Sequence, residues 1–238
     1  MRQNQIGAIK NNNEKLLILK TPNHNTSNNN AKDNDLANAA EIQCPRSITD
    51  EDRSRAQMYQ LLGVLLGGPP SSELLRGLAS LQGDDTVLGT ASKNLAALAK
   101  RTAPDDARQE YNNLFVGVGR GELLPFASYY LTGFLNEKPL ADLRGDLMAR
   151  GIKASDDVKE PEDHMGTLCE IMAGIITGAF ECDSDLSSQK AFFDAHLAKW
   201  AALFFTDLET AQTAIFYTPV GSLGRAFMDI EADAFALQ

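Results

Sequence analysis

The sequence EPEDHMGTLCEIMAGIITGAF occupies residues 160–180 and contains a long apolar run from Met165 to Phe180. A helix that is apolar on nearly every side is buried, so this run predicts the central helix of an all-α core. Proline is favoured at the first helical position, and acidic residues suit the positive end of the helix dipole, so we expect the helix to begin at Pro161. Asp163 and His164 allow a second interpretation, because they place a carboxylate and an imidazole beside backbone N–H groups that have no helical partner.

Helical periodicity continues on both sides of this run. Upstream, we expect helices over residues 49–66, 72–81, 87–100, 104–116 and 139–151, the last with Leu140, Leu143, Leu147 and Met148 facing inward. Downstream, one helix is expected to carry Phe192 to Phe204 with His196 as a hydrogen-bonded core histidine, followed by shorter helices near 207–217 and 220–235. No period-2 strand and no internal repeat is evident. The pattern predicts an all-α fold, a single globular bundle of about ten helices over residues 47–238.

Residues 1–46 have a different composition, with asparagine runs at 11–13 and 28–30, few aromatic residues and no sustained periodicity. Such a segment buries too little apolar area to offset its ordering entropy, so we expect a mostly disordered tail. Its short apolar run, Leu16 to Leu19, could alternatively pair as a strand or dock on the folded body.

The charge balance separates the two regions further. Residues 1–46 carry six Lys/Arg and four Asp/Glu (+2), and the remainder carries 16 and 28 (−12), which together give the formal charge of −10. An acidic body argues against nucleic acid as a ligand and would attract a cationic peptide. The alternative is an acidic surface that serves solubility alone.

Cysteine usage and hydropathy indicate a compartment. Three cysteines, Cys44, Cys169 and Cys182, form no CxxC pair, and an odd number argues against a disulfide framework. No segment reaches the ~20 apolar residues that a membrane-spanning helix needs, and residues 1–20 lack a signal-peptide core. We therefore expect a cytoplasmic protein without stable membrane insertion.

Motifs for enzymes and metal sites are missing from the sequence. Paired Glu-x-x-His, Gly-x-Ser-x-Gly and His-Glu-x-x-His motifs do not occur. His164 and Cys169 lie five residues apart and turn to different faces of one helix, which does not suit zinc. The loop with Gly117, Gly119 and Gly121 lacks the Gly-Lys-Ser/Thr of a P-loop, although nucleotide binding there stays an alternative. We expect no enzyme activity, no metal and no bound cofactor.

Three linked motifs resemble the TorD/DmsD family of redox-enzyme maturation chaperones, and the resemblance extends from about residue 50 to the C-terminus. It includes the late Phe193, His196, Trp200 and Phe204 and the pair Phe216-Tyr217. The motifs are Glu110-Tyr111 with Leu114–Gly117, then Leu124-Pro125 with Ser128–Leu131, then Glu160-Pro161-Glu162-Asp163-His164.

This resemblance implies a TorD-like helical chaperone that binds the twin-arginine signal peptide of a molybdenum or tungsten oxidoreductase in the cytoplasm. Such a chaperone holds the apo form of the enzyme back from Tat export until its cofactor is inserted. By position, the implied peptide-binding residues are Pro125, Phe126, Ser128, Tyr129, Pro161, Asp163 and His164, with Tyr59 as a looser match.

The chemistry of these residues suits such a ligand. Asp163 is expected to accept hydrogen bonds from a guanidinium, and Phe126, Tyr129 and Tyr130 are expected to offer apolar area to the hydrophobic region of the peptide. With carboxylates beside it, His164 is expected to titrate near neutral pH and to make peptide affinity pH-sensitive.

The chain departs from the family pattern at Phe126, where many members carry tryptophan, and in its Asn-rich tail. The run from Ser128 to Leu140 resembles members that accompany formate dehydrogenase. Either a monomer or a domain-swapped dimer is compatible with the sequence, with connections at 67–70 and 153–159 as candidate hinges. The competing interpretations are a general all-α interaction scaffold, in which Asp163 and His164 only cap a helix, and an all-α nucleotide-binding protein.

Overall fold

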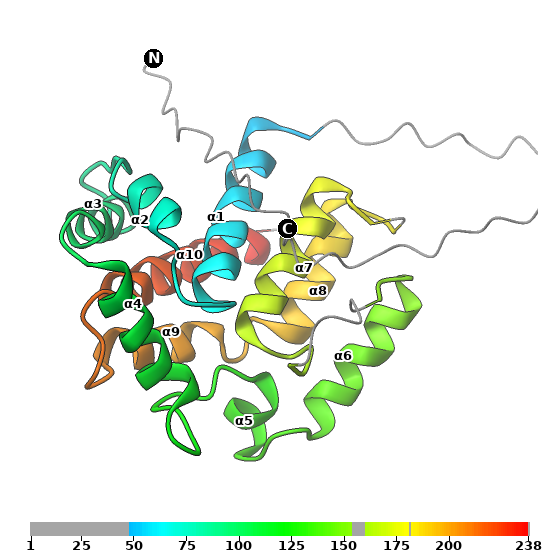
Figure 1. The fold of residues 1–238 in the computed structure, drawn as a ribbon. Helices are drawn as coiled ribbons and strands as arrows, with labels where there is room; N and C mark the ends of the chain where they lie inside the picture. The colour runs from blue at the N-terminus through cyan, green and yellow to red at the C-terminus, as the bar shows by residue number, and fades with distance from the viewer. Residues whose placement is uncertain (1–47, 154–159, 181, 238) are drawn as a thin grey trace, which may run out of the picture.

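The computed structural model describes residues 48–153, 160–180 and 182–237, which form ten α-helices and one π-helical segment (Figure 1). Within these ranges the backbone forms no β-strand, and an isolated antiparallel bridge pairs Phe126 with His164. The all-α prediction is therefore confirmed. The elements are α1 (Asp50–Leu66), α2 (Ser72–Leu78), α3 (Val87–Ala99), α4 (Pro104–Tyr111), the π-helical segment Asn112–Val116, α5 (Ala127–Thr132), α6 (Lys138–Ala149), α7 (Met165–Thr177), α8 (Leu186–His196), α9 (Ala201–Thr210) and α10 (Thr218–Ala236).

Helix α7 is the central element, as predicted, because ten of its 13 residues are buried. It packs most extensively against α1 and lies beside α8 (Figure 1). Two glycines let the helices approach: a Cβ on Gly63 of α1 would lie 3.3 Å from the carbonyl oxygen of Gly166 of α7. The start of the helix differs from the prediction, since α7 begins at Met165 with His164 as its N-cap, and Pro161 precedes it.

Helix α10 packs against α9 and α3 and reaches α1. Its contact with α9 depends on Gly221, where a Cβ would lie 2.4 Å from the backbone nitrogen of Glu209. Its contact with α1 is polar and buried, because Arg55 Nε donates to Glu231 at 2.7 Å and Tyr59 Oη donates to the same carboxylate at 3.1 Å. These contacts fix the last helix against the first.

Two carboxylates hold the segment before α10 in a non-helical conformation. Glu110 accepts hydrogen bonds from the backbone N–H groups of Ile215, Phe216 and Tyr217 at 2.7–3.0 Å, and Glu122 accepts from residues 212 and 213. The expected helix over 207–217 is therefore wrong, because these amide groups are satisfied by side chains from elsewhere in the chain.

Several other expectations need correction. The aromatic helix is divided, since α8 ends at His196 and the chain turns before α9 begins at Ala201. Met148 of α6 was expected to face inward, and its side chain is exposed. The core histidine is confirmed, because His196 Nε2 lies 3.0 Å from Asp146 Oδ2 with its side chain only 9% exposed.

The predicted tail, residues 1–46, and most of the candidate hinge at 153–159 lie outside the described residues. In the part of the chain that the structure describes, no helix combines the length and the apolar character needed to cross a membrane.

Candidate functional site

Two of the three motifs meet in the structure. The backbone of Pro125 accepts a hydrogen bond from Met165 N at 2.7 Å, and Ala127 N donates to the Asp163 carbonyl at 3.0 Å. Together with the bridge between Phe126 and His164, these bonds pair the segment before α5 with the segment before α7. Residues 35 positions apart in sequence are thereby fixed side by side.

Asp163 holds this junction together from inside. Its Oδ2 accepts from Ser128 N at 2.8 Å and from Ser128 Oγ. Ser128 is the second residue of α5, and the helix has no capping side chain of its own, so Asp163 acts as its N-cap from another part of the chain. Only 1% of Asp163 is exposed, and its Oδ1 has no hydrogen-bond partner among the described residues. The expectation that Asp163 presents its carboxylate to a guanidinium at the surface therefore needs correction.

His164 is also part of the interior. Its Nδ1 accepts from Gly166 N at 3.1 Å, which places the proton on Nε2, and its ring contacts Phe126 edge to face at a centroid distance of 5.2 Å. Burial lowers the pKa of His164 to about 4. The expectation of titration near neutral pH is wrong, because desolvation of the imidazolium outweighs the neighbouring carboxylates.

Tyr59 does not line a groove with these residues. It is fully buried and belongs to the contact between α1 and α10 through its hydrogen bond to Glu231. Burial and the Glu231 charge raise the pKa of Tyr59 well above its usual value. Pro125 and Ser128 are buried as well, so together with Asp163 and His164 four of the predicted residues support the site from within.

Three predicted residues reach solvent: Phe126, Tyr129 and Pro161 are each half-buried. Phe126 is the extended N-cap of α5, and Tyr129 is the third residue of that helix. Tyr130 instead turns toward the core, where it packs against Trp200 at a centroid distance of 5.3 Å and donates to Asp207 at 2.9 Å. We call the surface formed by Phe126, Tyr129 and Pro161 the aromatic surface.

A carboxylate that the sequence reasoning did not select lies at the edge of this surface. The side chain of Glu160 is 60% exposed, and one of its oxygens lies 3.7 Å from His164 Nε2. Glu160 forms no ion pair with a lysine or arginine of the described ranges, whereas Glu162 pairs with Arg144 at 2.7 Å. Partial burial raises the pKa of Glu160. Its position next to Pro161 was the available signal, but solvent access could not be deduced from the sequence.

A cavity of about 230 Å³ lies beside the buried carboxylate of Asp163. Its lining comes from α5, α6, α7 and the end of α8, and it includes Leu131, Leu143 and Leu168. Lys138 and Lys199 also border it. The cavity therefore joins the junction of the two motifs to apolar residues of three helices.

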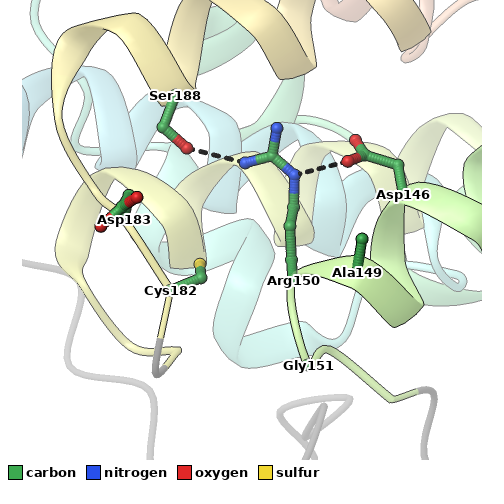
Figure 2. Close-up of a pocket in the computed structure, with 7 residues that line it drawn as sticks. All are labelled: Asp146, Ala149, Arg150, Gly151, Cys182, Asp183 and Ser188. Carbon is green, nitrogen blue, oxygen red and sulfur yellow. Dashed lines mark hydrogen bonds and ion pairs between the residues drawn. The ribbon is translucent and has the colours of Figure 1, made fainter.

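A larger hollow of about 750 Å³ lies between the end of α6 and the start of α8 (Figure 2). Figure 2 shows the Arg150 guanidinium between Ser188 Oγ, at 2.7 Å, and Asp146, at 2.9 Å. Its cation is thus already paired, and the hollow shares no residue with the predicted site. We therefore place the candidate site at the aromatic surface rather than at the larger hollow.

Neither a metal site nor a P-loop emerges from the structure. The described residues contain no group of three or more His, Cys, Asp or Glu side chains that could hold a metal ion. The loop with Gly117, Gly119 and Gly121 follows a π-helical segment and leads into the extended Leu124-Pro125 instead of a helix N-terminus. The geometry of a phosphate-binding loop is absent from this part of the chain.

Comparison with known proteins agrees with the motifs. The family model described as nitrate reductase delta subunit matches residues 81–206. The chaperone protein TorD of Vibrio atlanticus is 26% identical over 206 residues, covering 78% of this chain and 96% of the relative. A TorD chaperone of Vibrio cholerae is 30% identical over 166 residues, covering 65% of this chain and 74% of the relative.

A solved structure shares the fold. A protein from Archaeoglobus fulgidus, described as a candidate redox enzyme maturation protein, superimposes with a TM-score of 0.51 at 18% identity, covering 74% of this chain and 93% of its own. The family match and the TorD relatives together settle the assignment. The chain belongs to the TorD/DmsD family of redox-enzyme maturation chaperones, and it is not an enzyme.

Proposed function

We propose that this chaperone binds the twin-arginine signal peptide of a molybdenum or tungsten oxidoreductase at the aromatic surface. One observation supports the proposal: backbone hydrogen bonds pair the segment that carries Phe126 with the segment that carries Pro161, and Glu160 directly precedes Pro161 in the chain. Aromatic rings supply apolar area for the hydrophobic region of a signal peptide, and a carboxylate without a cationic partner supplies a bidentate acceptor for a guanidinium.

The geometry divides the residues of the proposed site into two groups. Phe126, Tyr129 and Glu160 are accessible and make the contacts. Ser128, Asp163 and His164 are buried and act as positioning residues, because they fix α5 relative to α7. This division explains how a change at a buried motif residue would abolish peptide binding without removing a contact to the peptide.

Long-range electrostatics favours the same ligand. The chain after residue 46 carries 28 acidic and 16 basic residues, so its net charge attracts a cationic leader segment over distances of about one Debye length, roughly 8–10 Å at moderate salt. Binding in the cytoplasm would hold the apo enzyme back from Tat export while its cofactor is inserted. We propose formate dehydrogenase as the cargo, on the similarity of residues 128–140 to chaperones of that enzyme.

The test is calorimetric titration of the full chain with a twin-arginine signal peptide and with the same peptide carrying lysines in place of both arginines. We expect micromolar or tighter affinity for the arginine peptide, about −8 kcal/mol or better, and weaker binding of the lysine peptide because Lys cannot bind a carboxylate bidentately. Added salt should weaken binding. Equal affinity for the two peptides would contradict the proposal and favour a general scaffold.

Two variants distinguish a residue that contacts the peptide from a residue that only positions α5. Glu160→Gln should weaken binding about tenfold with little change in thermal stability, because the carboxylate is 60% exposed and its approach to His164 is loose. Asp163→Asn should weaken binding and lower stability together, because it alters the buried cap of α5. Glu73→Gln on α2 removes the same charge from an exposed site away from the aromatic surface and serves as the control.

A panel of signal peptides from several oxidoreductases would test the choice of cargo.

A further inference from the structure

Tyr129, the accessible tyrosine of the aromatic surface, already holds a guanidinium. Arg120 Nη2 donates to Tyr129 Oη at 2.8 Å, and the Arg120 Cζ lies 5.2 Å from the centroid of the Tyr129 ring. Arg120 forms no ion pair within the described ranges, although the chain after residue 46 carries 28 acidic side chains. The ring and hydroxyl of Tyr129 are thus the groups that bind this cation.

The backbone conformation of residues 117–122 holds Arg120 next to Tyr129. Gly117 and Gly119 adopt φ of +61° and +88°, a region that favours glycine. A Cβ on Gly117 would lie 1.8 Å from the carbonyl oxygen of Arg120, so the turn closes tightly on itself. On the far side, Glu122 is anchored by hydrogen bonds from residues 212 and 213. Between these fixed points Val118 is fully exposed, and nothing covers the tip of the loop.

We propose that Tyr129 is a guanidinium-binding residue of the peptide site, that Arg120 is its resting occupant, and that an arginine of the bound peptide displaces Arg120. This inference rests on the proposed function and assigns a role to the glycine-rich loop that the motifs left unexplained. Displacement is easy because the Arg120 contact is exposed to solvent, where a cation–π contact is weak. In the proposed site, an arginine of the peptide also pairs with the exposed carboxylate of Glu160, which forms no ion pair with Arg120 in the described ranges.

A resting occupant lowers the fraction of chaperone that is ready to bind, so removing it must tighten binding. In the full chain, Arg120→Ala should lower the dissociation constant for the twin-arginine peptide about three- to tenfold, as expected when a weak competing contact is removed. Tyr129→Leu should weaken binding of the arginine peptide and remove its preference over the lysine peptide.

The control is Arg101→Ala, which removes the same positive charge from an exposed side chain without a hydrogen bond or ion pair in the described part of the chain. If only the loss of a positive charge mattered, Arg120→Ala and Arg101→Ala would change the affinity for the peptide equally. The inference is overturned if Arg120→Ala binds no more tightly than Arg101→Ala, or if it binds more weakly than the wild type. Absence of binding to every variant would overturn the proposed function as well, whereas wild-type binding that ignores Arg120 overturns this inference alone.

Discussion

At the scale of single residues, the buried N-cap of α7, His164, and the half-buried Glu170 within that helix have opposing effects on stability. Burial lowers the pKa of His164 from 6.5 to about 4 and raises the pKa of Glu170 from 4.5 to about 7. Below pH 6.5 the unfolded chain protonates its histidine and the folded chain does not, so the His164 contribution is lost as pH falls toward 4. Between pH 4.5 and 7 the folded chain keeps a proton on Glu170 that the unfolded chain releases, so that contribution is lost as pH rises.

Substitution of either residue should reveal the effect of the other. We expect Glu170→Gln to gain stability with rising pH between 4.5 and 6.5 relative to the wild type, by up to about 1.4 kcal/mol per pH unit, because Glu170 then no longer opposes the effect of His164. His164→Asn, which keeps an N-cap side chain, should lose stability with rising pH. Urea unfolding at pH 5, 6 and 7 measures both slopes. Parallel slopes in the two variants would contradict this account, since all other groups are common to them.

The residue scale also shows how much of the site the sequence could reveal. The motifs identified Phe126, Tyr129 and Pro161, each of which the structure leaves partly accessible to solvent. They could not distinguish contact from support, because burial depends on how α5 packs against α7. For the same reason the titration expected of His164 was wrong, and Glu160 was not selected. The spacing of residues along the chain indicates which side chains lie close together. How far each side chain is removed from water depends on the tertiary structure and cannot be deduced from that spacing.

At the scale of elements, helix existence followed from apolar periodicity, and helix ends did not. The segment 160–164 has the composition of a helix start, yet the bridge between Phe126 and His164 holds its end extended. Residues 215–217 are likewise kept out of a helix by Glu110, more than 100 positions earlier in the chain. In both cases a residue far away in the sequence pairs with the backbone hydrogen-bonding groups, and the local sequence does not indicate that partner.

Two glycines in helices should respond oppositely to alanine. A Cβ on Gly221 would meet the backbone of Glu209 at 2.4 Å, whereas a Cβ on Gly145 of α6 has no atom within 4 Å. We expect Gly221→Ala to destabilise the fold by about 1–3 kcal/mol through overpacking of α9 and α10. Gly145→Ala should stabilise it by up to about 1 kcal/mol, because alanine is the better helix former. Thermal unfolding of both variants tests this, and a stabilising Gly221→Ala would show that the two helices can separate freely.

At the scale of the whole molecule, a buried polar network connects three helices. Arg55 of α1 pairs with Glu231 of α10 through two hydrogen bonds, at 2.7 and 2.8 Å, and its Nη1 donates to Gln189 of α8 at 2.9 Å. Glu231 is only 1% exposed. The network fixes the relative positions of the first and last helices, because every member must keep its partners in a medium that solvates charge poorly.

Removing one partner of this pair should be costly. Glu231→Ala leaves the Arg55 cation and the Tyr59 hydroxyl without their main acceptor, and we expect a loss of about 3–5 kcal/mol in the free energy of unfolding. The control is Asp229→Ala on the same helix, whose exposed carboxylate pairs only loosely with Arg225 at 3.9 Å and should change stability by less than about 0.5 kcal/mol. Urea denaturation of both variants measures the difference, and similar losses would show that the network adds nothing to the fold.

The hydrogen bonds that Glu110 and Glu122 accept from the backbone of residues 212–217 affect the order in which the protein can fold during synthesis. These bonds join positions that are 90 to 107 apart in sequence. A ribosome adding about 5–20 residues per second produces the amide partners of both carboxylates some 5–20 seconds after the carboxylates themselves. During translation Glu110 and Glu122 therefore lack their backbone donors for this time. The segment before α10 can be fixed only after residues 212–217 have been synthesised.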